Sequence, residues 1–331
     1  MNDTPILVTG GAGYIGSHAV LALLDAGFRP VVLDDLSTGN PALVPDGVPL
    51  VRGNVGDRAR VVDTLKRFDV RAVLHFAGSI IVPESVERPL DYYRNNTANS
   101  LSLFQGCLDA GVDKVIFSST AAVYGQPEQV PVTEETRPAP INPYGASKLM
   151  TEQMLADADP AHGLRSVVLR YFNVAGADPQ MRTGQMSATT THLIRAACET
   201  ALGRRARLDV FGTDYPTADG TCVRDFIHVS DLAEAHVLAL RHLLDGGPSL
   251  VLNCGYGRGY SVRDVVSAIQ GITGRPLPVR EAPRRAGDPP SVVADNSKIR
   301  ELLGWRARHD DLRTIIATSL EWQRRLPSHA A

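Results

Sequence analysis

A glycine-rich turn between an apolar run and a helical segment is the feature that most constrains the fold. Gly10, Gly13 and Gly16 occur in TGGAGYIG, directly after the strand-like run PILVTG and at the start of a segment with helical periodicity. A backbone without Cβ atoms lets a pyrophosphate approach closely, and the free amides of a helix N-terminus favour its oxygens. This order predicts a dinucleotide site, whereas the alternative is a tight turn without any ligand.

Short β-branched runs recur along the chain and alternate with helical segments. The runs are PILVTG, PVVLDD, VPLVRGN, AVLHFAG, KVIFSST and RSVVLRYFN. Such alternation predicts a parallel sheet covered on both faces. We expect an α/β chain with a Rossmann-type doubly wound sheet over 1–175, a return to this sheet at about 226–255, and a smaller α/β substrate-binding lobe over 176–331. The segment HVSDLAEAHVLALRHLL should form a long helix capped by Ser230.

Composition excludes several classes of function. The net charge of -2 argues against general attraction to nucleic acid or an anionic membrane, since both require excess lysine and arginine. The first residues, MNDTPILVTG, contain no basic region ahead of a long apolar run. The four cysteines are widely separated and have no metal-ligand spacing, which is typical of reduced thiols. We therefore expect a cytoplasmic protein without a metal site.

An acidic residue follows the second predicted strand. Asp34 ends this strand, where a carboxylate accepts hydrogen bonds from a ribose and repels a 2'-phosphate. The sequence therefore favours NAD over NADP as the cofactor. The neighbouring Asp35 is expected to be solvated or to lie behind the ribose contacts.

A tyrosine and a lysine stand four residues apart in NPYGASKLM. On a helix, this spacing places Tyr144 and Lys148 on one face, where the ammonium is expected to lower the pKa of the phenol and make it a base. KVIFSST ends at the carboxyl edge of the predicted sheet, so Ser118, Ser119 or Thr120 can contact the reacting oxygen, and Thr120 is the preferred candidate. An exposed Tyr and Lys on a surface helix is the alternative.

These stretches are part of an ordered series of motifs that extends over nearly the whole chain. The series is TGGAGYIGSH, LDDLSTG, HFAG, PESVERPLDYYRNN, FSSTAAVYG, PYGASKLMTE, LRYFNVAGADP, VFGTDYPTADGTCVRDFIHVSDLA and APRRAGDPP. It closely resembles the UDP-sugar 4-epimerases of the extended short-chain dehydrogenase/reductase family. The resemblance implies a tightly held NAD and interconversion of UDP-galactose and UDP-glucose through a 4-keto intermediate, with transient hydride transfer from C4 of the sugar.

The resemblance also assigns roles to individual residues. Tyr144 would be the base, Lys148 would hold the phenolate and the nicotinamide ribose, and Thr120 would bind the sugar O4. NAD would further contact Gly10, Gly13, Tyr14, Ile15, Gly16, Asp34, Asn54, Val55, Phe76, Ala77, Gly78, Asn95, Ser118 and Phe172. The UDP-sugar would contact Asn173, Leu193, Phe211, Arg224, Arg284, Asp288 and Val292. Arginine forks suit a diphosphate, although either arginine alone is more often a surface charge.

The sequence departs from the family pattern at two positions near the cofactor. Ile80 stands where many bacterial members have a lysine near the cofactor diphosphate, and Asn54 replaces an acidic residue near the adenine. Neither position touches the reacting carbon, so these departures bear on NAD affinity rather than on the type of reaction.

Other activities of the same family are the nearest alternatives. Dehydratases carry acidic residues, and decarboxylases a glutamate, just after the active-site Thr or Ser, where this chain has Ala121 and Ala122. Epimerisation is therefore favoured over elimination. A dehydrogenase that releases NADH and a non-enzymatic NAD sensor remain weaker alternatives. The sugar pair can be a hexose, an N-acetylhexosamine or a pentose pair.

The resemblance also implies a homodimer, because the family typically dimerises through two helices per subunit. In this chain these helices would be 99–111 and 146–158, whose apolar residues can equally be buried within one subunit.

Overall fold

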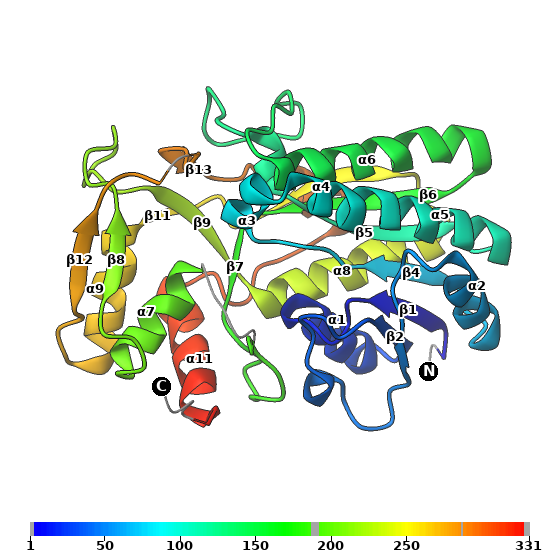
Figure 1. Ribbon diagram of the computed structural model, residues 1–331, viewed down its shortest axis with the longest axis horizontal. Helices are drawn as coiled ribbons and strands as arrows, with labels where there is room; N and C mark the ends of the chain where they lie inside the picture. The colour runs from blue at the N-terminus through cyan, green and yellow to red at the C-terminus, as the bar shows by residue number, and fades with distance from the viewer. Residues whose placement is uncertain (1–2, 187–191, 286, 328–331) are drawn as a thin grey trace.

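A seven-stranded parallel sheet forms the centre of the computed structural model, which describes residues 3–186, 192–285 and 287–327 (Figure 1). Its strands, in spatial order, are β10 (Leu250–Cys254), β6 (Arg165–Tyr171), β5 (Lys114–Thr120), β4 (Ala72–His75), β1 (Pro5–Thr9), β2 (Arg29–Asp34) and β3 (Leu50–Arg52). Because strand order reverses between β1 and β4, a crevice for ligands is expected there at the carboxyl edge. The predicted Rossmann-type doubly wound fold is confirmed.

Helices cover both faces of this sheet, because its strands are apolar on both sides. One face packs against α1 (Tyr14–Asp25) and α8 (Val229–Leu244). The other packs against α2 (Arg58–Arg67), α5 (Asn99–Ala110) and α6 (Pro143–His162). The short helical segments are η1 (Pro41–Leu43), α3 (Val82–Glu87), α4 (Pro89–Tyr92), η2 (Tyr93–Ala98), η3 (Ala121–Tyr124) and α10 (Ser297–Leu303).

The remaining elements gather at the other end of the molecule, on the left in Figure 1. They comprise β7 (Asn173–Ala175), β9 (Val223–His228), β11 (Gly259–Ser261) and β13 (Ser291–Val292) in one sheet, β8 (Leu208–Phe211) paired with β12 (Val279–Ala282), and helices α7 (Leu193–Ala201), α9 (Val262–Thr273) and α11 (Leu312–Arg325). These three helices share a separate apolar cluster. β10 then returns to the main sheet, where it pairs in parallel with β6.

The predicted cap of α8 is wrong. The helix begins at Val229, and its N-cap is His228, whose side chain accepts a hydrogen bond from the Ser230 amide at 3.1 Å. Ser230 therefore lies inside the first turn, and its hydroxyl has no hydrogen-bond partner in the described part of the chain. The His228 imidazole, two positions earlier, thus satisfies one of the free amides of the first helical turn.

All four cysteines are buried and unpaired. Across the described ranges, no helix combines the length and apolar character needed to cross a membrane. In the same ranges, no group of three or more His, Cys, Asp or Glu side chains is arranged to hold a metal ion.

Candidate active site

The glycine turn between β1 and α1 is tightly packed on its protein side. A Cβ on Gly10, whose φ is +70°, would lie 2.7 Å from the Ala77 amide nitrogen, and one on Gly16 would lie 2.2 Å from the Gly10 carbonyl oxygen. A Cβ on Gly13 would meet only that same carbonyl oxygen, at 3.2 Å. Packing within the protein therefore excludes a side chain at Gly10 and Gly16. At Gly13 the protein makes a single contact, so a ligand can approach the backbone there.

Asp34 lies at the end of β2 beside this turn. Its carboxylate accepts hydrogen bonds from the Ala12 amide at 3.0 Å and the Leu36 amide at 2.8 Å, and burial raises its pKa. The backbone therefore fixes its direction while further lone pairs remain for a ribose. Asp35 instead accepts hydrogen bonds from Ser37 and from the Asn54 side chain.

The other predicted cofactor residues lie along the same carboxyl edge. Tyr14 and Ile15 begin α1, Asn54 and Val55 follow β3, Phe76, Ala77 and Gly78 follow β4, Asn95 lies in η2, and Phe172 follows β6. The Tyr14 hydroxyl donates to the Gly176 carbonyl at 2.6 Å, so it also ties the turn to the loop after β7. Ile80, at the position of the expected lysine, is exposed.

Tyr144 and Lys148 lie in the first half of α6, which faces the end of β5. Asn142 caps this helix by accepting from the Gly145 amide at 2.9 Å, and Pro143 occupies its first position. The Lys148 ammonium donates to the Ser118 carbonyl at 2.9 Å. Thr120 ends β5 and makes a side-chain hydrogen bond with Tyr144. The predicted tyrosine, lysine and threonine are thus brought together.

The pKa of Tyr144 differs from the expectation that Lys148 lowers it. Burial raises the pKa of this phenol, and the hydrogen bond with Thr120 only partly opposes the effect. Burial also lowers the pKa of Lys148 to about 8, against the influence of the Glu152 carboxylate. In the protein alone, desolvation therefore dominates the pKa of both groups.

The sequence reasoning missed two residues that contact the predicted site, Glu152 and Tyr171. Glu152 lies on the Tyr144–Lys148 face of α6 and forms a buried ion pair with Arg170 of β6. The Ser118 hydroxyl contacts the hydroxyl of buried Tyr171. The repeated four-residue spacing that links Tyr144, Lys148 and Glu152 is the signal that could have identified the glutamate.

On the substrate side, Arg224, Asp288 and Val292 lie close together. The Arg224 guanidinium donates to the Pro289 carbonyl at 2.8 Å and lies 3.7 Å from the Asp288 carboxylate. Val292 pairs with Arg224 between β13 and β9 and is buried in an apolar cluster that contains Phe172. The predicted substrate residue Val292 therefore adjoins the predicted cofactor residue Phe172.

The remaining substrate candidates lie in other segments of the chain. Arg284 is exposed and forms an ion pair with Asp214 at 2.7 Å, so its guanidinium is already engaged by a carboxylate. Phe211 ends β8 and stacks under the guanidinium of Arg285 at 4.3 Å. Asn173 begins β7 and Leu193 begins α7, and both line a small cavity.

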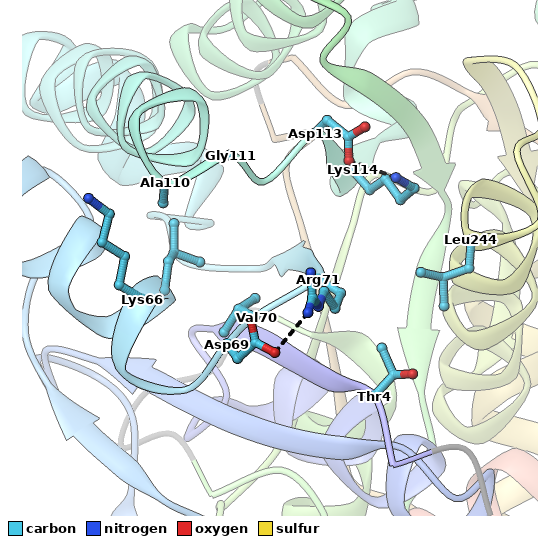
Figure 2. A pocket seen from close by; sticks show the side chains of 11 residues that line it. Thr4, Lys66, Asp69, Val70, Arg71, Ala110, Gly111, Asp113, Lys114 and Leu244 are labelled. Atoms are coloured by element: carbon cyan, nitrogen blue, oxygen red, sulfur yellow. Dashed lines mark hydrogen bonds and ion pairs between the residues drawn. The ribbon is translucent and has the colours of Figure 1, made fainter.

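A larger cavity of about 530 Å³ lies at the opposite edge of the sheet. Figure 2 shows its lining, where Arg71 pairs with Asp69 and Lys114 pairs with Asp113. Its wall includes the ends of α2, α5 and α8, whose carbonyl groups favour cations. It contains none of the predicted site residues, so the chemistry is assigned to the carboxyl edge.

Comparisons with known proteins identify the family of this chain. The model of the NAD dependent epimerase/dehydratase family matches residues 6–255. A protein named UDP-glucose 4-epimerase from Azospirillum brasilense is 62% identical over 97% of this chain and 92% of its own length.

Solved structures give the same result. The chain resembles a UDP-glucose 4-epimerase from Brucella ovis in complex with NAD, with a TM-score of 0.93 and 48% identity over 96% of this chain and 98% of that one. It also resembles a UDP-Glc/GlcNAc 4-epimerase from Campylobacter jejuni, with a TM-score of 0.85 and 45% identity over 98% of this chain and all of that one (100%). The chain belongs to the NAD dependent epimerase/dehydratase family.

Proposed function

We propose that this protein is an NAD-dependent UDP-sugar 4-epimerase, an isomerase that interconverts UDP-galactose and UDP-glucose. The observation that carries the proposal is the placement of Tyr144 and Lys148 on one face of α6, against Ser118 and Thr120 at the end of β5. The glycine turn lies at the same sheet edge. The relatives from Azospirillum and Campylobacter support the substrate class, and the Brucella structure supports the cofactor.

NAD supplies a reversible hydride acceptor for C4 of the sugar when it is bound. Tyr144 removes the proton of the 4-hydroxyl and later returns it to the same oxygen, while Thr120 hydrogen-bonds that oxygen. Lys148 supplies a positive charge that favours the phenolate form. Asp34 accepts hydrogen bonds from the cofactor ribose, and Gly13 leaves room for the pyrophosphate. The other cofactor and substrate residues predicted from sequence keep their roles in this proposal.

The two-lobe division follows from these roles. In the proposal, 1–175 with the return at about 226–255 binds NAD, and 176–331 forms the lobe that binds the UDP-sugar. Arg224 and Arg284 are the diphosphate candidates. Of these two, Arg224 is the better placed, since it is partly buried beside Val292, whereas Arg284 is exposed and paired with Asp214.

The residues after Thr120 favour epimerisation over elimination. Ala121 and Ala122 begin η3 at the position where dehydratases and decarboxylases carry acidic groups, and neither alanine can move a proton. A pentose pair is the second substrate candidate within the same reaction type.

An assay with UDP-galactose tests the function. We expect UDP-glucose to form without stoichiometric accumulation of NADH, because the cofactor is regenerated in each turnover. Stoichiometric NADH would indicate a dehydrogenase, and a dehydrated sugar product would indicate a dehydratase. If none of a panel of UDP-hexoses, UDP-N-acetylhexosamines and UDP-pentoses is converted, the proposal is refuted.

We also propose that the protein is a homodimer built on α5 and α6, which lie side by side in Figure 1. Leu101 on α5 and Met150 on α6 are 45% and 47% exposed, whereas Leu103 of α5 and Leu155 of α6 are buried. The double substitution Leu101→Glu with Met150→Glu should yield monomers by sedimentation velocity. Leu302→Glu on α10, at a leucine that is 46% exposed, is the matched control and should leave the dimer intact.

A cytoplasmic location completes the proposal. Four buried cysteines without a disulfide are typical of a reducing compartment. Fractionation of cells that express the chain tests this point, and recovery in an oxidising compartment would contradict it.

A further inference from the structure

Three side chains on one face of α6 contact three consecutive residues of β5. Tyr144, Lys148 and Glu152 are spaced four residues apart, so they stack one helical turn above another. Their partners are Thr120 for Tyr144, the Ser118 carbonyl for Lys148, and the Ser119 hydroxyl, which donates to the Glu152 carboxylate. The contact between Ser119 and Glu152 includes neither a base nor a substrate contact of the proposed reaction. It nevertheless lies one helical turn from the Lys148 ammonium.

The Glu152 carboxylate is held from its other side by Arg170. The Arg170 Nε lies 3.1 Å from both carboxylate oxygens, and its Nη2 completes the pair at 2.5 Å. Arg170 also donates to the Tyr124 hydroxyl at 3.0 Å, and that hydroxyl donates to Asn253 at 2.7 Å. Glu152 therefore belongs to a hydrogen-bonded network that joins α6, β6, η3 and β10.

The burial of the Glu152–Arg170 ion pair suggests a role other than stability. Glu152 and Arg170 are 6% and 5% exposed. A buried ion pair is often no more stable than an apolar pair of the same volume, so stability alone is a weak reason for its presence. The register that the pair imposes is a better reason, because Ser119 immediately precedes Thr120 and pairs with Arg170 across the sheet.

We infer that Glu152 is a positioning residue for the Tyr144–Lys148 pair, fixing the register of α6 against β5 and placing a negative charge one turn from Lys148. This inference rests on the proposed epimerase function. A loss of about 1 Å in the alignment of reacting groups lowers turnover by about 100-fold. A carboxylate near an ammonium also favours the charged form of that ammonium.

Other titratable groups also face this pair. Besides burial, Lys148 lowers the pKa of His75 of β4, and Tyr144 raises the pKa of Tyr171 of β6 and of Tyr92 of α4. Arg170 of β6 pairs with Glu152. Among these groups and Glu152, only Glu152 opposes the effect of burial on the pKa of Lys148. Removing its charge should therefore make Lys148 lose its proton at lower pH.

Three variants separate the parts of this role. Glu152→Gln removes the charge and keeps the shape, whereas Ser119→Ala removes the contact to β5 and keeps the charge. Asp178→Asn is the control for loss of an ion pair to a buried carboxylate, since Asp178 is 5% exposed and pairs with the partly exposed Arg182 at 2.9 Å outside α6 and β5. For each variant, kcat and KM for UDP-galactose are measured from acid to alkaline pH, and bound NAD is measured after purification.

In Glu152→Gln and Ser119→Ala we expect kcat to fall by about 10- to 100-fold, with KM within about twofold of the wild-type value and NAD retained. The alkaline limb of the kcat profile should move to lower pH by about 1 unit in Glu152→Gln only. Near-native kcat in Ser119→Ala, or an unmoved limb in a folded Glu152→Gln protein, overturns the inference. If Glu152→Gln does not fold, the kcat of Ser119→Ala alone tests the inference. A wild-type chain that converts no UDP-sugar refutes the proposed function instead.

Discussion

The Lys148 ammonium donates a hydrogen bond to the Ser118 carbonyl at 2.9 Å, although the two residues come from α6 and β5. The same ammonium lies 5.0 Å from the centre of the Phe117 ring. Both contacts hold the charge at the end of the strand, one helical turn from Tyr144. The position of the Lys148 ammonium is therefore fixed by the protein before any substrate binds, as preorganised catalysis requires.

Tyr144→Phe tests this base, because it removes the phenol oxygen and keeps the ring. We expect turnover to fall by about 100-fold or more, as is usual on loss of general acid–base catalysis. NAD should still co-purify, since the glycine turn and Asp34 are unchanged. Progress curves with UDP-galactose and the NAD content of the purified variant are the measurements. Near-native turnover would show that another group is the base.

Exclusion of NADP should depend on Asp34. Its carboxylate is fixed by the Ala12 and Leu36 amides, so it cannot easily turn away from a 2'-phosphate. Protein stripped of cofactor should regain activity with NAD and stay inactive with NADP. Asp35→Asn is the matched control and should keep this preference, because Asp35 is bound to Ser37 and Asn54. Equal reactivation by both cofactors would contradict the role of Asp34.

Two alanine substitutions in the glycine turn should fail in different ways. Gly16→Ala places a Cβ 2.2 Å from the Gly10 carbonyl oxygen, so we expect it to destabilise the folded protein itself. Gly13→Ala meets only a 3.2 Å contact within the protein, so it should fold and lose mainly NAD affinity. Urea denaturation without cofactor, followed by NAD titration, distinguishes the two. Equal stability losses would remove the argument that Gly13 serves the ligand.

Acid should destabilise the fold through buried neutral histidines. His236 is fully buried, its ring lies 4.7 Å from that of Phe76, and burial lowers its pKa to about 4. Below pH 6.5, the usual pKa of histidine, His236 is protonated in the unfolded chain but stays neutral in the folded protein down to about pH 4. The free energy of unfolding therefore decreases as the pH falls from about 6.5 to about 4. For this one residue the loss by pH 5 is about 2 kcal/mol.

His236→Phe should remove that part of the acid sensitivity. Urea denaturation at about pH 7 and pH 5 should show a smaller difference in unfolding free energy for the variant than for the wild type. His242→Phe is the control, because His242 is not buried. An identical pH dependence in His236→Phe and the wild type would contradict the prediction.

The sequence was sufficient for the fold class, because glycine spacing and apolar strands are local signals. The Tyr144–Lys148 spacing similarly predicted that both face one side of α6. Three features depend on tertiary packing instead. The N-cap of α8 is His228, whose ring also contacts the Thr318 hydroxyl of α11 at 3.0 Å. Burial reverses the expected shift of the Tyr144 pKa, and Glu152 acquires its partner Arg170 from β6.

The last prediction concerns the range of sugars that fit the site. Val292 is 8% exposed and lies in one apolar cluster with Phe172 and Tyr124. The resemblance to the 4-epimerases implies that this position lines the pocket beside the sugar 2-substituent, where a tyrosine is expected to exclude N-acetyl sugars. Valine lacks the aromatic ring and hydroxyl of tyrosine, so it occupies less volume at this position and is expected to leave room for an acetamido group.

We therefore expect the wild-type protein to convert UDP-GlcNAc as well as UDP-glucose, and the 45% identical UDP-Glc/GlcNAc 4-epimerase from Campylobacter jejuni supports this expectation. Val292→Tyr should selectively lower kcat/KM for UDP-GlcNAc, because steric overlap in a packed site is costly. Ser291→Tyr is the matched control, since successive strand residues point to opposite faces. If wild-type protein does not convert UDP-GlcNAc, or if Val292→Tyr leaves the ratio of the two activities unchanged, then Val292 does not select the sugar.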